Sequence, residues 1–463
     1  MTAQTILPAN SATGAFEVTN SLRFNGSNSS LSRTVANAAV TNAVFSCWFK
    51  RSTLSANQTI YSTQAGNEEV RIKIHSDNKL DVYHHDGSNY VYRMQTNRLF
   101  VDPSAWYHLV IRVDTTNGTA DNRIRIYING TQETSFAARS NPASDSNIEW
   151  FQGATGYIGI SEDGSSNPFG GYLAEVAMID GSTTEHTVFG EFDEDTTTVW
   201  KPKAVYGAVG LGTNGWYLNF KDSSSLGNST GNSNNFTANN LAATDQSTDT
   251  CTNNFCTMNP NLGGLYTPTF SEGNLQVAQS TNNQHAVTHG TFAVTKGVWY
   301  WEVKYIGNTG TSGPSDRAVG IQTPNVSDVF VQASYNSNGS ITYYGYDGGE
   351  VWDEGTATTA DYGTYSQNSI LGISLDMDNG VISFYIDGNE VVNNYALGDH
   401  ASVIATPAVL WPNGTASGTE MGMNFGSPFY ALSSAVADAN GYGAFEYTPV
   451  GYALCTKNLA EFG

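Results

Sequence analysis

The chain has 463 residues, of which only 13% are charged, and its 42 acidic side chains outnumber its 20 basic ones. The formal net charge of −22 excludes a nucleic-acid-binding protein, because a phosphate backbone is bound mainly through clustered Lys and Arg. Hydrophobic residues make up 39% of the chain and aromatic residues 12%, which excludes intrinsic disorder. At ~100 to 200 residues per domain, this length predicts two or three domains.

The beginning of the chain does not have the pattern of a secretory signal peptide. Residues 1–20 contain neither Lys nor Arg and no continuous apolar run. No apolar run elsewhere approaches the ~20 residues that a membrane helix needs. We therefore expect a protein without membrane insertion that folds in a cytoplasm, or that leaves it by a route requiring no signal peptide.

Apolar and polar residues alternate with a period of two through the first part of the chain, and no window keeps a helical period. This pattern predicts half-buried antiparallel strands over residues 70–75, 79–84, 108–114 and 122–130. Pairs such as Asn129-Gly130 follow them and tolerate the positive φ of tight hairpin turns. An all-β sandwich is therefore predicted for residues 21–185.

A second series of strands is predicted in the last third of the chain. It covers residues 298–306, 316–323, 340–352, 369–380, 381–391, 406–414 and 421–426. Residues 124–132 and 382–390 have nearly the same sequence, an amphipathic strand ending in Asn-Gly or Asp-Gly. We therefore predict a second sandwich, and one comparable β-hairpin in each half.

The segment between the two series is rich in Ser, Asn, Thr and Gly, a composition typical of a flexible linker. Large apolar residues nevertheless recur in it: Trp216, Tyr217, Leu218, Phe220, Leu226 and Phe236. A flexible linker has no use for such side chains, so we predict an ordered, loop-rich connector packed on one or both sandwiches. The predicted order is an attachment segment (1–20), a jelly roll (21–185), the connector (186–270), a second sandwich (271–430) and a packed tail (431–463).

The motifs of the two halves resemble two known families. Residues 21–34, 47–50, 106–114, 124–132 and 156–181 resemble a laminin-G-like or concanavalin-A-like jelly roll. Residues 299–305, 318–324, 343–352, 370–391, 407–414 and 421–426 are similar to SPRY domains. These resemblances imply two antiparallel β-sandwiches, the second of a kind that usually binds other proteins through loops at one end.

Residues 207–255 and 451–459 resemble segments that accompany such domains in structural proteins of tailed bacteriophages. The resemblance implies a non-enzymatic virion protein of the tail-fibre or head-fibre type, assembled in the host cytoplasm and displayed on the particle. Such a protein would attach to other virion proteins, bind host-surface glycans or proteins, and form a homo-oligomer such as a trimer. A capsid decoration (cement) protein is one alternative, and a secreted carbohydrate-active enzyme or lectin is another.

Catalytic patterns are weak throughout. Glycoside hydrolysis needs two facing carboxylates, and residues 191–196 lack the last Glu of an E-x-D-x-x-E pattern, so we interpret them as a solvated acidic loop. Glu175 and Asp180 are five residues apart and are expected on opposite sides of a strand. His108 follows Trp106-Tyr107 in an alternating strand and is interpreted as a partly buried, hydrogen-bonded residue. We predict no enzymatic activity.

Candidate ligand-binding residues are aromatic and polar side chains near loops, because sugar faces and protein hot spots favour Tyr and Trp. In the second half they are Tyr343, Tyr344, Tyr346, Asp347, Trp352, Trp411 and Asn413, and in the first half His85, Asp86, Asn89 and Tyr90. The alternative is that half of these aromatic residues belong to the core. No cofactor is predicted, with calcium as an alternative. Its candidate ligands are Asp114, Asn117, Asp121 and Asp163, with Glu162 nearby, although such residues commonly cap their own turns.

Cysteine usage is sparse, with four residues in the chain. Cys47 and Cys455 lie in apolar runs and are predicted to be buried. Cys251 and Cys256 form a C-x4-C pair without His, too little for a zinc site, and they depart from the bacteriophage sequences that this segment resembles. Both a local disulfide and a pair of free thiols remain open for them.

Overall fold

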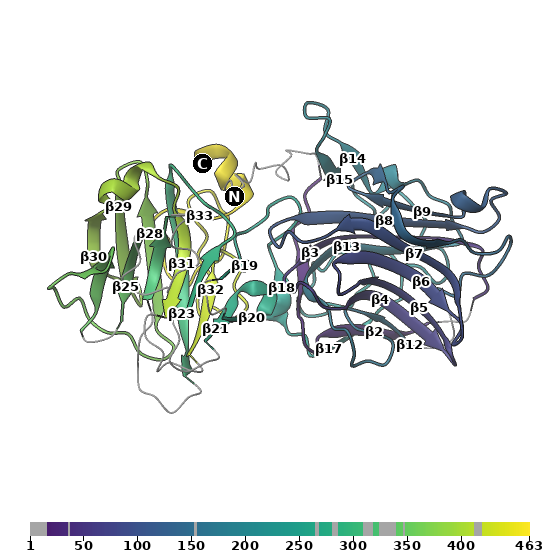
Figure 1. The fold of residues 1–463 in the computed structure, drawn as a ribbon, viewed down its shortest axis with the longest axis horizontal. Coiled ribbons are helices and arrows are strands. Elements are labelled where there is room, and N and C mark those ends of the chain that lie inside the picture. Colours follow the sequence, from purple (N-terminus) through teal and green to yellow (C-terminus); the bar gives the residue numbers. More distant parts are fainter. Residues whose placement is uncertain are drawn as a thin grey trace. The chain divides into compact units, whose positions relative to one another are not determined.

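The computed structural model describes residues 16–35, 38–151, 155–263, 268–279, 286–308, 318–323, 339–345, 348–411 and 419–463. The chain folds as two compact units, an N-terminal unit (Ala12–Thr252) and a C-terminal unit that contains Asn253–Gly463. Each unit consists almost entirely of antiparallel strands, which confirms the predicted all-β fold class (Figure 1). No helix in the described ranges has the length and hydropathy of a membrane span.

The N-terminal unit is a sandwich of two large sheets (Figure 1). The first has the order β10 (Thr131–Gln132), β9 (Ile124–Ile128), β8 (Trp106–Asp114), β3 (Asn42–Arg51), β13 (Gly170–Asp180), β1 (Ser21–Asn25) and β18 (Gln246–Ser247), with β16 (Trp216–Leu218) paired to β13. The second has the order β11 (Phe136–Ser140), β7 (Tyr90–Leu99), β6 (Lys79–His85), β5 (Glu68–Ile74), β4 (Gln58–Ala65), β12 (Thr155–Ile158), β2 (Ser30–Thr34) and β17 (Thr237–Asn239).

The two sheets enclose the main core of this unit. Along β5 the buried positions are Val70, Ile72 and Ile74, which is the predicted alternation of a half-buried strand. Facing them are apolar residues of the first sheet, among them Phe45 and Leu109. The smaller elements are the hairpin β14 (Gly190–Phe192) and β15 (Trp200–Pro202) and the 3-10 turns η1 (Ala120–Asn122), η2 (His186–Val188) and η3 (Ala243–Asp245).

Residues 186–252 are part of the N-terminal unit and complete its sandwich. They supply β16 and β18 to the first sheet and β17 to the second. They also cover the outer face of the first sheet, where Phe189, Val205 and Tyr217 pack on Val44 and Val110. As a result β3 and β13 are buried on both faces: every residue of β13 except the last is buried, and so is every residue of β3 except the first.

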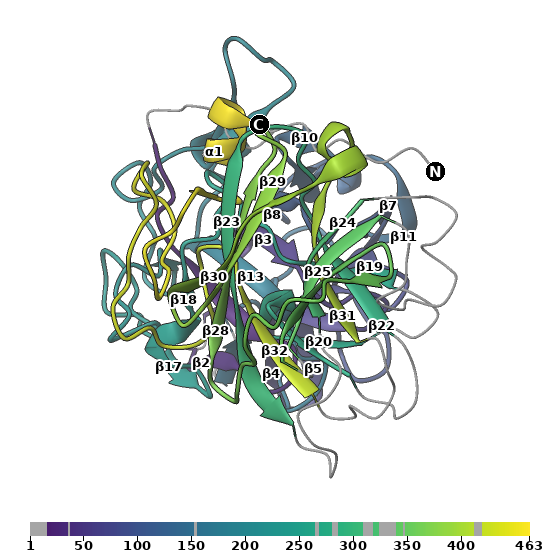
Figure 2. The ribbon, with the colours of Figure 1, turned by 90° about the vertical axis from the view of Figure 1, so that its left-hand side faces the viewer.

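The C-terminal unit has two further sheets, seen as separate layers in Figure 2. One has the order β19 (Met258–Gly263), β22 (Ala286–Gly290), β31 (Thr406–Trp411), β24 (Ala318–Gln322), β25 (Ser340–Tyr344), β26 (Glu350–Asp353) and β27 (Thr356–Ala357). The other has the order β20 (Thr269–Ser271), β21 (Gln276–Ala278), β32 (Thr419–Asn424), β23 (Val298–Asn308), β28 (Ile370–Asp376), β29 (Val381–Ile386) and β30 (Asn389–Ala396), with β33 (Tyr452–Ala453) parallel to β23. Short helical elements are η4 (Glu272–Asn274), η5 (Gly398–Ser402) and α1 (Thr456–Phe462).

Both units contain the predicted repeated hairpin. β9 turns into β10 through Asn129 and Gly130, with φ of 47° and 76°, and β29 turns into β30 through Asp387 and Gly388, with φ of 49° and 79°. Positive φ at both central residues is what a type I′ turn requires, which explains the Asn-Gly and Asp-Gly pairs. A Cβ on Gly130 would lie 2.1 Å from the Trp200 ring, and one on Gly388 would lie 2.5 Å from the Tyr447 ring. Each turn is therefore covered closely by an aromatic ring.

The tail of the C-terminal unit is fixed by the carboxyl group of Glu302, a fully buried residue of β23. Its Oε2 accepts hydrogen bonds from the backbone N–H of Glu446 (2.9 Å) and from Asn424 Nδ2 (3.0 Å). Its Oε1 accepts from the backbone N–H of Tyr447 (2.9 Å) and from the Tyr300 hydroxyl (3.3 Å). The carboxyl group thus holds residues 446–447 against the sheet.

Candidate ligand-binding pocket

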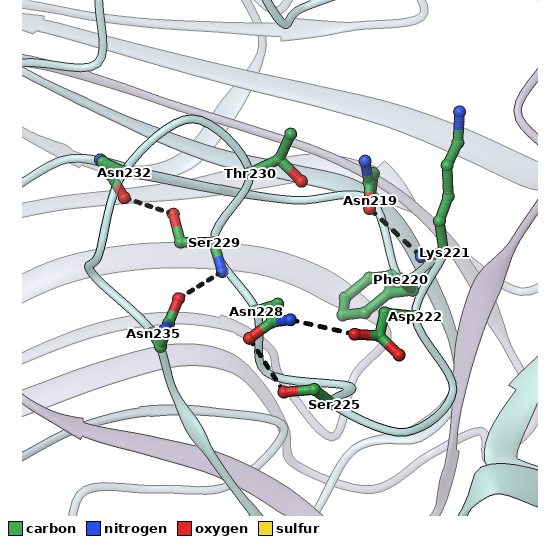
Figure 3. A pocket seen from close by; sticks show the side chains of 10 residues that line it. All are labelled: Asn219, Phe220, Lys221, Asp222, Ser225, Asn228, Ser229, Thr230, Asn232 and Asn235. Atoms are coloured by element: carbon green, nitrogen blue, oxygen red, sulfur yellow. Dashed lines mark hydrogen bonds between the residues drawn. The ribbon is translucent and has the colours of Figure 1, made fainter.

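A pocket of about 440 Å³ opens in the loop between β16 and β17 of the N-terminal unit (Figure 3). Its lining is dominated by amide and hydroxyl side chains, with one acidic, one basic and one aromatic residue. The lining residues are Asn219, Phe220, Lys221, Asp222, Ser225, Asn228, Ser229, Thr230, Asn232 and Asn235.

Apolar anchors hold this loop in one conformation. Phe220, Leu226 and Phe236 all join the main core, and they alternate with the polar residues that face the pocket. Gly227 lies against Phe236, whose backbone N–H donates to the Gly227 carbonyl (2.8 Å), and a Cβ at Gly227 would lie 2.0 Å from the Phe236 carbonyl oxygen. The polar loop is therefore attached to the sandwich at several points along its length.

Hydrogen bonds within the lining orient its amide groups, as Figure 3 shows. Ser229 donates from Oγ to Asn232 Oδ1 (2.7 Å) and from its backbone N–H to Asn235 Oδ1 (2.9 Å). Asn219 Oδ1 likewise accepts from the backbone N–H of Lys221 (3.2 Å). These bonds use the carbonyl oxygens of Asn219 and Asn235, which leaves their Nδ2 groups as donors for a ligand.

Charge in the pocket is balanced between two side chains. The Ser224 hydroxyl and backbone N–H donate to Asp222 and lower its pKa, so Asp222 is a carboxylate at neutral pH. Asn228 Nδ2 also donates to this carboxylate (3.1 Å), and Lys221 lies next to it in sequence. A pocket that offers many neutral donors and acceptors and little net charge suits an uncharged ligand rich in hydroxyl groups.

Two family models match the chain, each over part of one unit. Residues 25–189 match the concanavalin A-like lectin/glucanases superfamily. Residues 298–426 match the SPRY domain. The pocket lies in the N-terminal unit but C-terminal to the part of the chain that matches the concanavalin A-like domain. No curated protein sequence matches the chain.

Several solved structures are similar to part of this chain. The SPRY domain of human HERC1 is 17% identical, with a TM-score of 0.30, covering 36% of this chain and 96% of that chain. A putative carbohydrate binding protein from Bacteroides ovatus is 18% identical, with a TM-score of 0.29, covering 37% of this chain and 45% of that one. A heptameric SAP-like pentraxin from Limulus polyphemus is 18% identical, with a TM-score of 0.28, covering 37% of this chain and 82% of that one.

The predicted ligand-binding residues of the N-terminal unit lie together at the β6–β7 turn, and none of them lines the pocket. Asp86 Oδ1 accepts from the backbone N–H groups of Ser88 (2.8 Å) and Asn89 (2.7 Å), so Asp86 shapes the turn. Tyr90 is 46% exposed, contacts the His85 ring at 5.1 Å, and has the Arg93 guanidinium 4.8 Å from its ring centre. Tyr90 is thus displayed on this turn, whereas His85 Nδ1 and Asp86 Oδ1 accept hydrogen bonds from the backbone of the turn itself.

Among the predicted ligand-binding residues of the C-terminal unit, the three whose side chains the structure describes are buried or half-buried. Tyr343 is fully buried in the core and donates its hydroxyl to the Gly363 carbonyl, so it is not displayed on a loop. Tyr344 is 8% exposed and packs edge-on against the half-buried Trp352, with ring centres 6.2 Å apart. Trp411 ends β31, and its side chain lies outside the described part of the structure. Tyr346, Asp347 and Asn413 also lie outside the described residues.

The predicted calcium ligands are engaged in their own turns. Asp114 Oδ1 accepts from Thr116, Asn117 Oδ1 accepts from the Thr119 N–H, and Asp163 Oδ1 accepts from the N–H groups of Ser165 and Ser166. Asp121 pairs with Arg139 (3.3 Å), and Arg71 binds both carboxylate oxygens of Glu162. Among the described residues, no group of three or more His, Cys, Asp or Glu side chains is placed to hold a metal ion. Calcium binding stays an untested alternative.

Ser46 and His108 form a buried contact in the first sheet, but His108 is not in the protonation state that would let it activate a serine nucleophile. Trp200 Nε1 donates to His108 Nδ1 (2.9 Å), and Ser46 Oγ lies 3.0 Å from His108 Nε2. Because an indole N–H is only a donor, the proton of neutral His108 must be on Nε2, which then donates to Ser46. Burial lowers the pKa of His108 to about 3, so this neutral form is the one present. His108 therefore has no free site to accept the Ser46 proton.

The carboxylates considered for hydrolysis are also separated. Glu175 lies in a bulge of β13, is buried, and is hydrogen-bonded by the Tyr217 hydroxyl, whereas Asp180 accepts from Asn214 at the end of the same strand. In the acidic segment 191–196, Asp193 caps the backbone N–H groups of Asp195 (3.0 Å) and Thr196 (2.8 Å). Each of these carboxylates has a local structural partner.

All four cysteines are buried thiols in this structure, and no disulfide joins Cys251 to Cys256. Cys251 packs with Trp48, Trp106 and Trp200 on the outer face of the first sheet. Cys256 belongs to the core of the C-terminal unit, where its Sγ accepts from the Thr291 hydroxyl (3.7 Å). The two thiols therefore lie in the cores of different units.

The pocket residues were not among the sequence-based candidates. Their segment has the composition of a linker, and the useful signal was the spacing of its apolar residues. Four of these apolar residues are buried in the main core and fix the chain between them: Trp216, Phe220, Leu226 and Phe236. The intervening Asn and Ser residues are therefore held in place. An Asn-rich stretch with such anchors is a better candidate for a polar site than its composition suggests.

Proposed function

We propose that the N-terminal unit binds a neutral glycan in the pocket formed by residues 219–235, and that the chain is a binding protein rather than an enzyme. The main support is the lining of this pocket, in which oriented amides, hydroxyls and one carboxylate surround a space of about 440 Å³. That volume is within the ~300 to 1,000 Å³ of typical small-ligand sites. The match of residues 25–189 to a lectin and glucanase superfamily supports the same ligand class.

The chemistry of the lining matches that of a sugar. Each sugar hydroxyl both donates and accepts a hydrogen bond, and the pocket offers donors from Asn219 and Asn235 and an acceptor from Asp222. A site built to bond hydroxyl groups discriminates strongly against ligands that lack them, because its polar groups are then left unpaired. Phe220 also lines the pocket, and its buried side chain anchors this part of the loop in the main core.

The proposal of a non-enzymatic protein is supported by the arrangement of its acid and base groups. Glu175, Asp180 and Asp193 each have a structural hydrogen-bond partner. His108 is neutral and oriented so that it donates to Ser46. Neither set has the free, facing groups that hydrolysis of a glycosidic or ester bond requires.

Asn219→Ala and Asn235→Ala should each weaken glycan binding by about threefold to tenfold, since each removes a hydrogen-bonding amide worth roughly 0.5 to 1.5 kcal/mol. The measurement is binding of the full chain to an array of neutral and acidic glycans, followed by calorimetric titration of the best neutral glycan. Asn97→Ala, an exposed amide of β7, is the matched control and should bind like the wild type. Absence of glycan binding by the wild type would contradict the proposal.

The same glycans, incubated with the purified protein, should be recovered intact. Chromatography of the reaction would show any shortened product. Release of sugar by the wild-type chain would overturn the non-enzymatic part of the proposal and favour the carbohydrate-active enzyme instead.

We also propose that the chain is a structural protein of a bacteriophage particle, a tail fibre or head fibre displayed on the surface, with a capsid decoration protein as the alternative. The support is the resemblance of residues 207–255 and 451–459 to segments of tailed-bacteriophage structural proteins. In this proposal the SPRY domain (residues 298–426) attaches to other virion proteins, and the glycan is on the host surface. The particle would be assembled in the host cytoplasm from a homo-oligomer such as a trimer.

Mass spectrometry of purified particles should then find this chain in stoichiometric amounts with the other virion proteins. Electron microscopy with an antibody against the chain would place it on the head or on the tail. If the culture produces the chain but the purified particles lack it, the virion proposal is contradicted. The glycan-binding proposal would not be affected by that result, because it has its own test.

A further inference from the structure

A strongly exposed aromatic ring stands near the pocket. Tyr206 is 63% exposed, more than any other large hydrophobic residue in the described part of the chain, whereas Tyr90 is 46% and Phe192 is 41% exposed. Exposure of a single aromatic residue is unremarkable by itself, but the position of this one relative to the pocket is specific.

The Tyr206 ring packs directly on the backbone of Gly231. A Cβ placed on Gly231 would lie 2.6 Å from Tyr206 Cε2, and Gly231 has a φ of 94°, which favours glycine. Gly231 is therefore the residue that allows the ring to approach the loop. One side of the ring is supported by this contact, and the rest of it remains open to solvent.

Gly231 lies between Thr230 and Asn232, both of which line the pocket. Asn232 is fixed there by three hydrogen bonds. Its Oδ1 accepts from Ser229 Oγ (2.7 Å) and from the Asn234 backbone N–H (3.0 Å), and its Nδ2 donates to the Gly215 carbonyl (2.8 Å). The ring of Tyr206 thus rests on the same loop segment, residues 230–232, that contributes Thr230 and Asn232 to the wall of the pocket.

We infer that Tyr206 is a stacking platform for a second sugar ring, so that the ligand is a neutral oligosaccharide with one ring in the pocket and the next on Tyr206. This inference rests on the proposed glycan binding and specifies the size and placement of the ligand. The C–H face of a pyranose is apolar and packs on an aromatic ring, while its hydroxyls point to the sides, toward the polar wall. A ring that is already held on one side loses little conformational freedom when it binds.

The charge of the chain favours a neutral over an acidic oligosaccharide. The formal net charge is −22, and the pocket itself contains the ionised Asp222. Lys221 is the only cation in the lining. A polyanionic glycan would therefore be repelled by the field of the whole protein as it approaches.

Tyr206→Ala should weaken binding of a neutral oligosaccharide by about tenfold and leave the affinity for its terminal monosaccharide unchanged. The probes are the trisaccharides maltotriose, cellotriose and chitotriose with glucose and N-acetylglucosamine, followed by the best neutral glycan from the array with its own terminal sugar. Calorimetric titration of the full chain gives each affinity. Tyr206→Phe keeps the ring and should bind like the wild type. Phe192→Ala removes another exposed aromatic ring of the same unit, is the matched control and should also bind like the wild type.

Gly231→Ala tests the placement of the ring independently. The added methyl group must displace Tyr206, so this variant should lose the oligosaccharide preference although the tyrosine is still present. Equal oligosaccharide affinity in wild type and Tyr206→Ala would overturn the inference, and so would an equal loss for monosaccharide and oligosaccharide. If the wild type binds no glycan at all, the proposed function itself fails. That result comes from the wild-type titration alone, so it is distinguishable from a failure of the inference about Tyr206.

Discussion

Glu302→Gln is expected to lower the free energy of unfolding of the C-terminal unit by about 3 kcal/mol. Each carboxylate oxygen of Glu302 accepts two hydrogen bonds, one of them from a backbone N–H of the tail. A glutamine has one oxygen and one NH₂ group, so in either orientation the NH₂ group faces at least one backbone N–H of the tail, which then has no acceptor. Because Glu302 is fully buried, water cannot relieve this conflict.

Urea unfolding of the full chain, followed by intrinsic fluorescence and near-ultraviolet circular dichroism, would measure the loss. Glu390→Gln, an exposed glutamate of β30 in the same unit, is the matched control and should unfold like the wild type. Limited proteolysis should cut the Glu302 variant near residues 444–450 sooner than the wild type. An unchanged midpoint in Glu302→Gln would show that the carboxylate does not hold the tail.

The second large effect concerns Glu175 and pH. Burial raises the pKa of this carboxyl group to about 7, although the Tyr217 hydroxyl donates to it. In the unfolded chain the same group releases its proton near pH 4.5. Between these values the folded state binds more protons than the unfolded state, so stability falls as the pH rises. The shift corresponds to about 3 kcal/mol lost from the N-terminal unit between pH 4.5 and about pH 8.

Glu175→Gln should remove this contribution, because an amide keeps an acceptor for Tyr217 without a charge. Stability would be measured by thermal and urea unfolding at pH 5 and pH 8. Relative to the wild type, the free energy of unfolding of the variant should be higher at pH 8 than at pH 5. Glu194→Gln, an exposed acid of the same unit, serves as the control for a general charge effect. If the difference between Glu175→Gln and the wild type is the same at both pH values, Glu175 is not protonated in the folded state.

Much of the fold could be predicted because the evidence for it is local. The alternation along residues 70–75 and 108–114 identified β5 and β8, and the Asn-Gly and Asp-Gly pairs identified both repeated hairpins. By contrast, β3 and β13 do not alternate, since residues 186–252 cover their outer face. That burial depends on contacts between segments far apart in sequence, which a local pattern cannot report.

The candidate site was harder to predict for the same reason. An aromatic residue in an alternating strand points either to the core or to solvent, and the sequence alone does not tell which. Tyr343 points inward, whereas Tyr90 is exposed. Tyr206 and Gly231 are 25 positions apart, and only the folded structure shows that the ring packs on the glycine.

The first sheet of the N-terminal unit is buried on both faces along β3 and β13, and this determines where a shorter fragment of the protein can end. A fragment that stops at residue 189, where the match to the concanavalin A-like family ends, would expose Val44, Val110 and Ile179 to water. It would also lack β16, β17 and β18 at the edges of both sheets, and such open edges favour aggregation. An expression boundary that keeps the N-terminal unit whole therefore belongs after Thr252, and the same boundary keeps the pocket of residues 219–235 in the piece.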